Sequence, residues 1–111
     1  HYTFPALVTS DKIIEKEPES VRAAIRAIMK VQKALKEDPS RATIVGEKLF
    51  PAMEASMIAG LVERDLPFYD PMISEDKVNG MNGFAREIGL LTETVTYDQV
   101  VATEFISLWA E

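Results

Sequence analysis

The chain has 111 residues and a formal net charge of −6, with 47% hydrophobic and 27% charged residues. This composition is typical of a folded domain and excludes an intrinsically disordered chain. Eighteen Asp and Glu residues outnumber twelve Lys and Arg residues, which argues against nucleic-acid binding. No apolar run approaches the roughly 20 residues that a membrane helix requires, and the absence of cysteine excludes disulfides and thiolate metal sites.

The beginning of the chain predicts one strand. Residues 5–9 are mainly apolar and end in the β-branched Val8 and Thr9, which is typical of a short buried strand. A single strand leaves its backbone N–H and C=O groups without ladder partners. We therefore expect either a sheet supplied by other parts of a larger protein or a homodimer formed by strand exchange. Because the chain opens on His1 rather than Met, the sequence also suggests a processed or excised piece.

Two helices follow the strand. Ser10 is suited to cap a helix over 11–16, because its side-chain oxygen can accept a free amide of the first turn. Pro18 suits the first turn of a second helix over 18–36. Apolar residues recur along this second helix at helical spacing and predict a core-facing side. They are Val21, Ala24, Ile25, Ile28, Val31 and Leu35.

Two further helices precede an irregular region. Asp38 and Pro39 open a third helix to about residue 49, as cap and first position. A fourth helix over 52–63 is expected to bury its apolar side chains, and residues 65–71 then form a loop rich in Asp and Pro. The side chains expected in the core of the fourth helix are Met53, Met57, Ile58, Leu61 and Val62.

The last third of the chain predicts two more helices. Ser74 is the expected cap of a helix to about Ile88, and Gly89 suits the left-handed position just past its end. Thr96 and Gln99 have the spacing of a capping box before a final helix. The expected buried residues are Val78, Met81, Ala85 and Ile88 in the first of these helices, and Val101, Phe105 and Leu108 in the second.

The order of these signals resembles the C-terminal end of a family of solute-binding proteins. The matching stretch is ALVTSDKIIEKEPESVRAAIRAIMKVQKALKEDPSRA, in which Ser10, Pro18 and Pro39 occupy the family's helix starts. The later EIGLL around Gly89 and the pair Phe105-Ile106 are similar to its closing helices. The family includes the nitrate, sulfonate and taurine binders and the NMT1/THI5-like proteins that serve ABC importers.

The resemblance implies a fold, a function and a location. Residues 1–111 would be a single segment, mainly α with about six helices and one strand, within a lobe of the α/β type II periplasmic-binding fold. The complete protein would bind a small anionic solute in the periplasm or another extracytoplasmic compartment and present it to an ABC permease. Closure of its two lobes would be the signal, because the ligand binds the closed state better.

Several side chains are candidates for binding, each with a structural alternative. Tyr2 and Phe4 lie where the chain would enter from the hinge, so they are the candidate ligand-binding residues, or else they pack within their own lobe. Phe68 and Tyr69 either bind a ligand or hold their loop against the core. A third candidate, Arg22, Arg26, Lys30 and Lys33, shares one side of the second helix as a docking stripe or a solvated face.

The sequence offers little material for catalysis or metal binding. It lacks a phosphate-binding glycine loop and a nucleophile elbow, and its one histidine is His1. The carboxylates from Glu63 to Asp76 match no calcium-loop spacing, and the five Met residues are interpreted as core filler. We therefore expect a protein that is not an enzyme and uses no metal or cofactor. The alternatives are a free-standing helical protein-interaction domain and a fragment of a THI5-like pyrimidine-synthesis enzyme.

Overall fold

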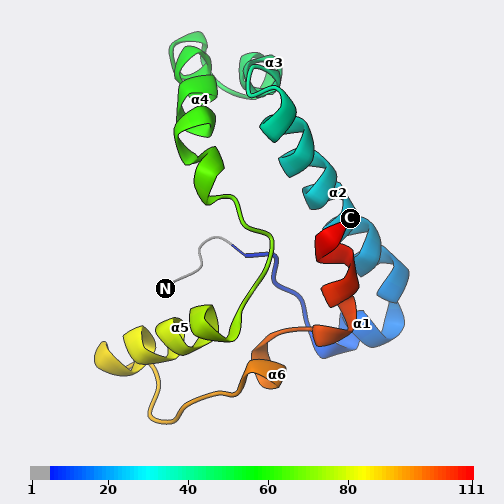
Figure 1. The fold of residues 1–111 in the computed structure, drawn as a ribbon, viewed down its shortest axis with the longest axis vertical. Helices are drawn as coiled ribbons and strands as arrows, with labels where there is room; N and C mark the ends of the chain where they lie inside the picture. Colours follow the sequence, from blue (N-terminus) through cyan, green and yellow to red (C-terminus); the bar gives the residue numbers. More distant parts are fainter. Residues whose placement is uncertain (1–5) are drawn as a thin grey trace. The chain divides into compact units, whose positions relative to one another are not determined.

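The protein is mainly helical in the computed structural model, which describes residues 6–111 apart from the side chains of Met53 and Ser56 (Figure 1). The number of α-helices in this part of the chain, six, agrees with the sequence-based expectation. The elements in chain order are α1 (Asp11–Lys16), α2 (Pro18–Glu37), α3 (Arg41–Leu49), α4 (Ala52–Asp65), the 3₁₀ helix η1 (Leu66–Phe68), α5 (Glu75–Glu87), α6 (Tyr97–Val100) and the 3₁₀ helix η2 (Thr103–Ala110).

The predicted strand is not confirmed. It was expected over residues 5–9, and residues 6–9 have no regular secondary structure and are exposed, with Leu7 at 52% and Val8 at 83%. Pro5 lies outside the described residues. A strand requires hydrogen bonds to a neighbouring strand, and residues 6–111 provide no such neighbour.

The backbone divides into two units. The first combines His1–Ile25 with Pro71–Glu111, and the second is Arg26–Asp70. Helix α2 begins in the first unit and ends in the second.

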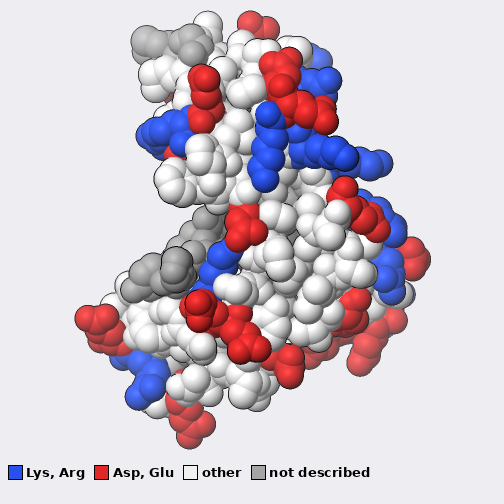
Figure 2. Space-filling view, viewed as in Figure 1, with Lys and Arg blue, Asp and Glu red and all other residues white. Residues whose placement is uncertain are grey.

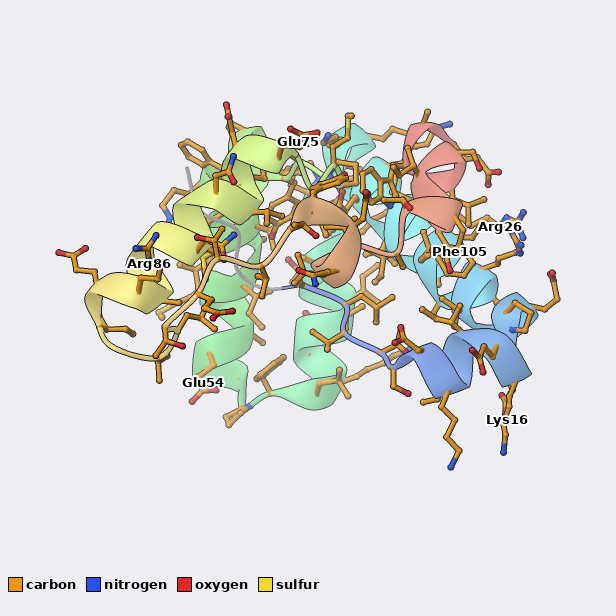
Figure 3. All side chains as sticks on the ribbon, turned by 90° about the horizontal axis from the view of Figure 1, so that it is seen from below. Lys16, Arg26, Glu54, Glu75, Arg86 and Phe105 are labelled. Atoms are coloured by element: carbon orange, nitrogen blue, oxygen red, sulfur yellow. The ribbon has the colours of Figure 1, made fainter. Side chains whose placement is uncertain are left out.

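The core of the first unit is formed by α2 and the C-terminal helix η2. Val21 of α2 packs with Phe105 and Leu108 of η2, and these side chains are 7%, 2% and 3% exposed. Phe105 lies between its own helix and α2 (Figure 3). The partly buried side chains around this cluster are Ile14, Ile25 and Ala102. Burial of each large side chain contributes about 1.5–3 kcal/mol, so this cluster is the main hydrophobic contact described in the first unit.

The final helix is interrupted, which differs from the prediction. The expected capping box is present, because the Thr96 N–H donates to Gln99 Oε1 at 2.8 Å. However, α6 ends after one turn, at Val100, and the next residue, Val101, is extended, with a φ of −111° and a ψ of 125°. The chain then continues as η2. Val101, Phe105 and Leu108 are nevertheless buried as expected, so the interruption preserves the apolar side of the segment.

The second unit contains a close contact between α3 and α4. Ala42 and Gly46 of α3 and Ala55 of α4 are its buried residues among those described. A Cβ atom added at Gly46 would lie 2.9 Å from Ile58 Cδ1 and 3.5 Å from the Ala55 Cα. Small residues therefore set the distance between the two helices, because larger side chains would separate their backbones.

The predicted core of the second unit is partly wrong. Met57 and Leu61 of α4 are 58% and 44% exposed, and Ile28 and Val31 of α2 are 40% and 57% exposed. The apolar residues recur at helical spacing, but the buried contact between α3 and α4 is formed by Ala and Gly residues that the predicted core did not include. The start of the third helix also differs, because residues 39–40 form a turn and α3 begins at Arg41.

Candidate functional site

Over most of α2, all the charged side chains are positive. Between residues 21 and 36 the sequence has five Lys or Arg residues and no Asp or Glu. The basic face predicted from the sequence, Arg22, Arg26, Lys30 and Lys33, lies on this stretch. At about 100° per residue these four side chains fall within one arc of the helix, roughly opposite Ile28 and Val31. The helix is therefore cationic on one side and apolar on the other.

Arg22, the first residue of the basic face, contacts Glu19 and Phe105 within the first unit. Its Nε donates to Glu19 Oε1 at 3.1 Å, and its Cζ lies 5.3 Å from the centroid of the Phe105 ring. A guanidinium over an aromatic face is attracted by the negative charge of the ring face. Arg22 thus helps to attach η2 to α2, which is a structural role.

The basic side chains in the later part of α2 are more exposed to solvent than Arg22. Lys30, Lys33 and Lys36 are exposed, and they form no salt bridge with residues 6–111. Figure 2 shows Lys and Arg side chains gathered over the second half of α2, at the upper right. The apolar side of the same stretch is also accessible, at Ile28 and Val31. This combination of exposed cations and exposed apolar groups is suited to a partner that is both acidic and apolar.

One buried polar atom on this stretch has no partner. Gln32 Oε1 is inaccessible to solvent and accepts no hydrogen bond from the described residues. A buried acceptor without a donor costs about 1–3 kcal/mol. Gln32 lies one turn after Ile28 on the helix, so the unpaired acceptor adjoins the exposed apolar side of α2.

The end of the chain has the opposite charge. Residues 87–111, here called the acidic segment, contain five Asp or Glu residues and no Lys or Arg. Leu90, Val100 and Ile106 within it are 74%, 53% and 39% exposed. The acidic segment and the later part of α2 are therefore complementary in charge, and both expose apolar side chains.

Two carboxyl groups in the second unit have pKa values below the ordinary range. The hydroxyl and the backbone amide of Ser40 both donate to Asp38, and these bonds lower the pKa of the Asp38 carboxyl. Hydrogen bonds from Arg64 lower the pKa of Asp65, with N···O distances of 2.7 and 3.0 Å. Both carboxylates satisfy local donors at helix ends, so neither resembles a catalytic acid with a raised pKa.

The other sequence-based candidates form no common site in the described part of the chain. Tyr2 and Phe4, the candidate ligand-binding residues, lie outside the described residues. Phe68 is 82% exposed, so it does not hold its loop against the core, whereas Tyr69 is half-buried. Met57 and Met72 are more than half exposed, which makes their interpretation as core filler wrong.

Residues 6–111 contain neither a cluster of metal-binding side chains nor a helix that could span a membrane. No three His, Asp or Glu side chains in this part lie close enough together to hold a metal ion. None of the helices described here is both long enough and apolar enough to span a bilayer.

Asn82 joins α5 to the segment before α6 through side-chain hydrogen bonds, and the sequence analysis did not predict this role. It is 5% exposed; its Nδ2 donates to the Val95 carbonyl at 2.8 Å, and its Oδ1 accepts from the Val95 N–H at 3.1 Å. In the same unit the Tyr97 hydroxyl donates to the Ile73 carbonyl at 2.6 Å. The sequence did contain a signal for this role. Asn82 lies four residues after Val78 on the apolar side of α5, where a buried polar side chain requires a hydrogen-bond partner.

Comparisons with known proteins identify no relative: the chain matches no family model, no curated protein and no solved structure.

Proposed function

We propose that this chain is the helical part of an extracytoplasmic solute-binding protein that delivers a small anionic solute to an ABC permease. The observation that carries the proposal is the agreement between the motifs behind the resemblance and the ends of three helices. Ser10 Oγ accepts the Ile13 N–H at 3.4 Å before α1, α2 begins at Pro18, and Gly89 has a φ of +78° after α5.

The exposed segment before α1 is consistent with the proposal. Leu7 and Val8 are apolar, accessible and outside any helix, so they are available to pair with a sheet of the α/β lobe. In that lobe residues 1–111 would contribute to packing and to one side of the hinge, and they would not carry out catalysis. Tyr2 and Phe4 would line the cleft wall beside the ligand.

Ligand binding by the complete protein is the direct test. We would measure the melting temperature with nitrate, sulfate, taurine and an alkanesulfonate, each at several millimolar. A ligand that binds only the folded state stabilises it, by about 2.7 kcal/mol at a hundred times its Kd. We expect at least one anion to raise the melting temperature in a saturable manner. No shift with any anion would overturn solute binding of the proposed class.

The strand is tested separately by replacing Val8. In a paired strand, Val8→Pro removes a ladder donor and lowers the melting temperature, whereas the matched control Val8→Thr keeps the amide and the branched side chain. Equal melting temperatures for the two variants would mean that residues 6–9 pair with no sheet.

A second candidate function is a helical protein-interaction domain. It is favoured by the absence of a strand from residues 6–111 and by the accessible apolar side chains of α3 and α4, such as Ile44 and Leu49 at 58% and 71% exposure. Cooperative unfolding of residues 1–111 alone, with equal stability of the two Val8 variants, would support this candidate.

A further inference from the structure

The later part of α2 presents an exposed surface, here called the α2 docking surface, that is centred on Ala27, with Lys30 on one side of it and Val31 on the other. Lys33 and Ile28 lie further round the helix, at the two outer edges of this surface. At about 100° per residue, Ala27 lies between Lys30 and Val31 on the helix, so a small side chain separates the charged edge from the apolar edge. Ala27 is also exposed. A partner helix lying over Ala27 could contact Lys30 on one side and Val31 on the other.

We propose that the α2 docking surface binds the acidic segment, residues 87–111, of a second copy of this chain. The first argument is charge complementarity. The surface belongs to a stretch with five cations and no carboxylate, and the acidic segment has five carboxylates and no cation. Opposite potentials favour association and orientation, whereas like charges oppose incorrect pairings.

The second argument is that the chain already contains a contact of this kind. Within the first unit, Phe105 and Leu108 of the acidic segment pack on Val21 of α2, and Arg22 lies over the Phe105 ring. This contact uses apolar burial beside a cation, and the α2 docking surface continues the same helix with the same two components. Glu93 and Glu104 remain exposed on the acidic segment, so a second copy can reach them.

The assembly has twofold symmetry in its simplest form. Each copy contributes one α2 docking surface and one acidic segment, which gives two equivalent contacts and closes the dimer. Exposed ion pairs contribute little individually, so the dimer is weak and depends on salt, because the Debye length falls from about 10 Å at 0.1 M to about 3 Å at 1 M. This inference does not depend on the proposed solute-binding function.

The test is sedimentation velocity over a concentration series up to about 1 mM. We expect a dimer at low ionic strength whose dissociation constant rises roughly tenfold or more on addition of 0.5 M salt. Wild-type protein that stays monomeric at low ionic strength overturns the proposal. A dimer that is insensitive to salt overturns it as well.

Reversing the charges on each side of the contact tests whether the α2 docking surface and the acidic segment bind each other. The double variant Lys30→Glu/Lys33→Glu and the double variant Glu93→Lys/Glu104→Lys should each be monomeric, because like charges then face each other in both contacts. An equimolar mixture should form a heterodimer, because both contacts are again complementary. Failure of the mixture to associate contradicts the proposal.

Control variants separate this contact from other effects. Lys12→Glu/Lys16→Glu makes the same change in net charge on exposed residues of α1, and it should leave the dimer unchanged. Circular dichroism of each variant checks that the helices are retained. A dimer formed instead by strand exchange at residues 5–9 would persist in all three double variants, and that result would overturn the proposed contact.

Discussion

The contact between α2 and η2 in the first unit and the contact between α3 and α4 in the second are built from different side chains. The first buries Val21, Phe105 and Leu108, which are large apolar residues. The second buries Ala42, Gly46 and Ala55, which are small. Large side chains gain free energy from the area that they remove from water. Small ones permit a close backbone approach and leave neighbouring apolar side chains accessible.

This difference explains why the exposed apolar surface of α3 and α4 is extensive. Ile44, Val45 and Leu49 of α3 are all more than half exposed although they lie on a helix in close contact with another. The contact itself uses the side of α3 that carries Ala42 and Gly46, and Ile44 lies roughly opposite that side. Leu49 lies on nearly the same side as Ala42 but at the last position of the helix. A helix pair of this kind leaves apolar side chains accessible to a further partner, whereas the first unit encloses Phe105, the largest fully buried side chain among the described residues.

The largest expected effect concerns the first unit. Phe105→Ala removes a side chain that is 2% exposed, and such truncations lower the free energy of unfolding by about 3–5 kcal/mol. Urea unfolding followed by circular dichroism measures the change. The matched control Phe68→Ala, at a position that is 82% exposed, should change the free energy of unfolding by less than about 0.5 kcal/mol. Similar losses in both variants would contradict the assigned core.

The next effect concerns the link between α5 and the segment before α6. Asn82→Ala removes both hydrogen bonds to Val95, and the free energy of unfolding should fall by about 1–3 kcal/mol. Asn79→Ala makes the same change at an exposed position of α5, where alanine favours the helix. A stability measurement that does not separate the two variants would show that the bonds to Val95 are unimportant.

A smaller effect tests the close contact in the second unit. In an open helix, Gly→Ala raises the free energy of unfolding by about 1 kcal/mol. We expect this gain for Gly60→Ala, because no atom lies within 4 Å of its added Cβ. For Gly46→Ala the gain should be smaller, because Ile58 Cδ1 lies 2.9 Å from the new Cβ and must move to make room for it. Thermal unfolding compares the two, and an equal gain at both positions would argue against the close approach.

The smallest effect depends on pH. Because hydrogen bonds from Ser40 lower the pKa of Asp38 in the folded protein, Asp38 contributes stability above its unfolded pKa of about 4. That contribution is lost as the pH falls through the lower folded pKa. The stability difference between wild type and Asp38→Ala should therefore be present at neutral pH and disappear in strong acid. Glu37→Ala controls for the loss of one charge. A difference that persists in strong acid would exclude the ionised carboxylate as its cause.

The local signals of the sequence predicted the helices well. Ser10 and Ser74 accept first-turn amides, Thr96 and Gln99 form the capping box, and Gly89 adopts the left-handed conformation. These features depend on a few neighbouring residues and on backbone geometry, so they are readable without tertiary contacts.

The candidate sites were less predictable. The basic face of α2 followed from helical spacing, but the engagement of Arg22 by Phe105 joins residues far apart in the sequence. Asn82 and Val95 likewise meet only after α5 and the following segment are arranged. Such contacts depend on which helix sides face each other, and periodicity alone does not specify the partner.

The sequence by itself determined where most helices begin and end, because caps, prolines and glycines act over one turn. It also determined the opposite charges of α2 and the acidic segment. Only the tertiary structure decided that Val21 is buried while Ile28 and Val31 on the same helix side stay exposed. The physical reason is that burial requires a second surface, and within the first unit η2 supplies that surface for Val21.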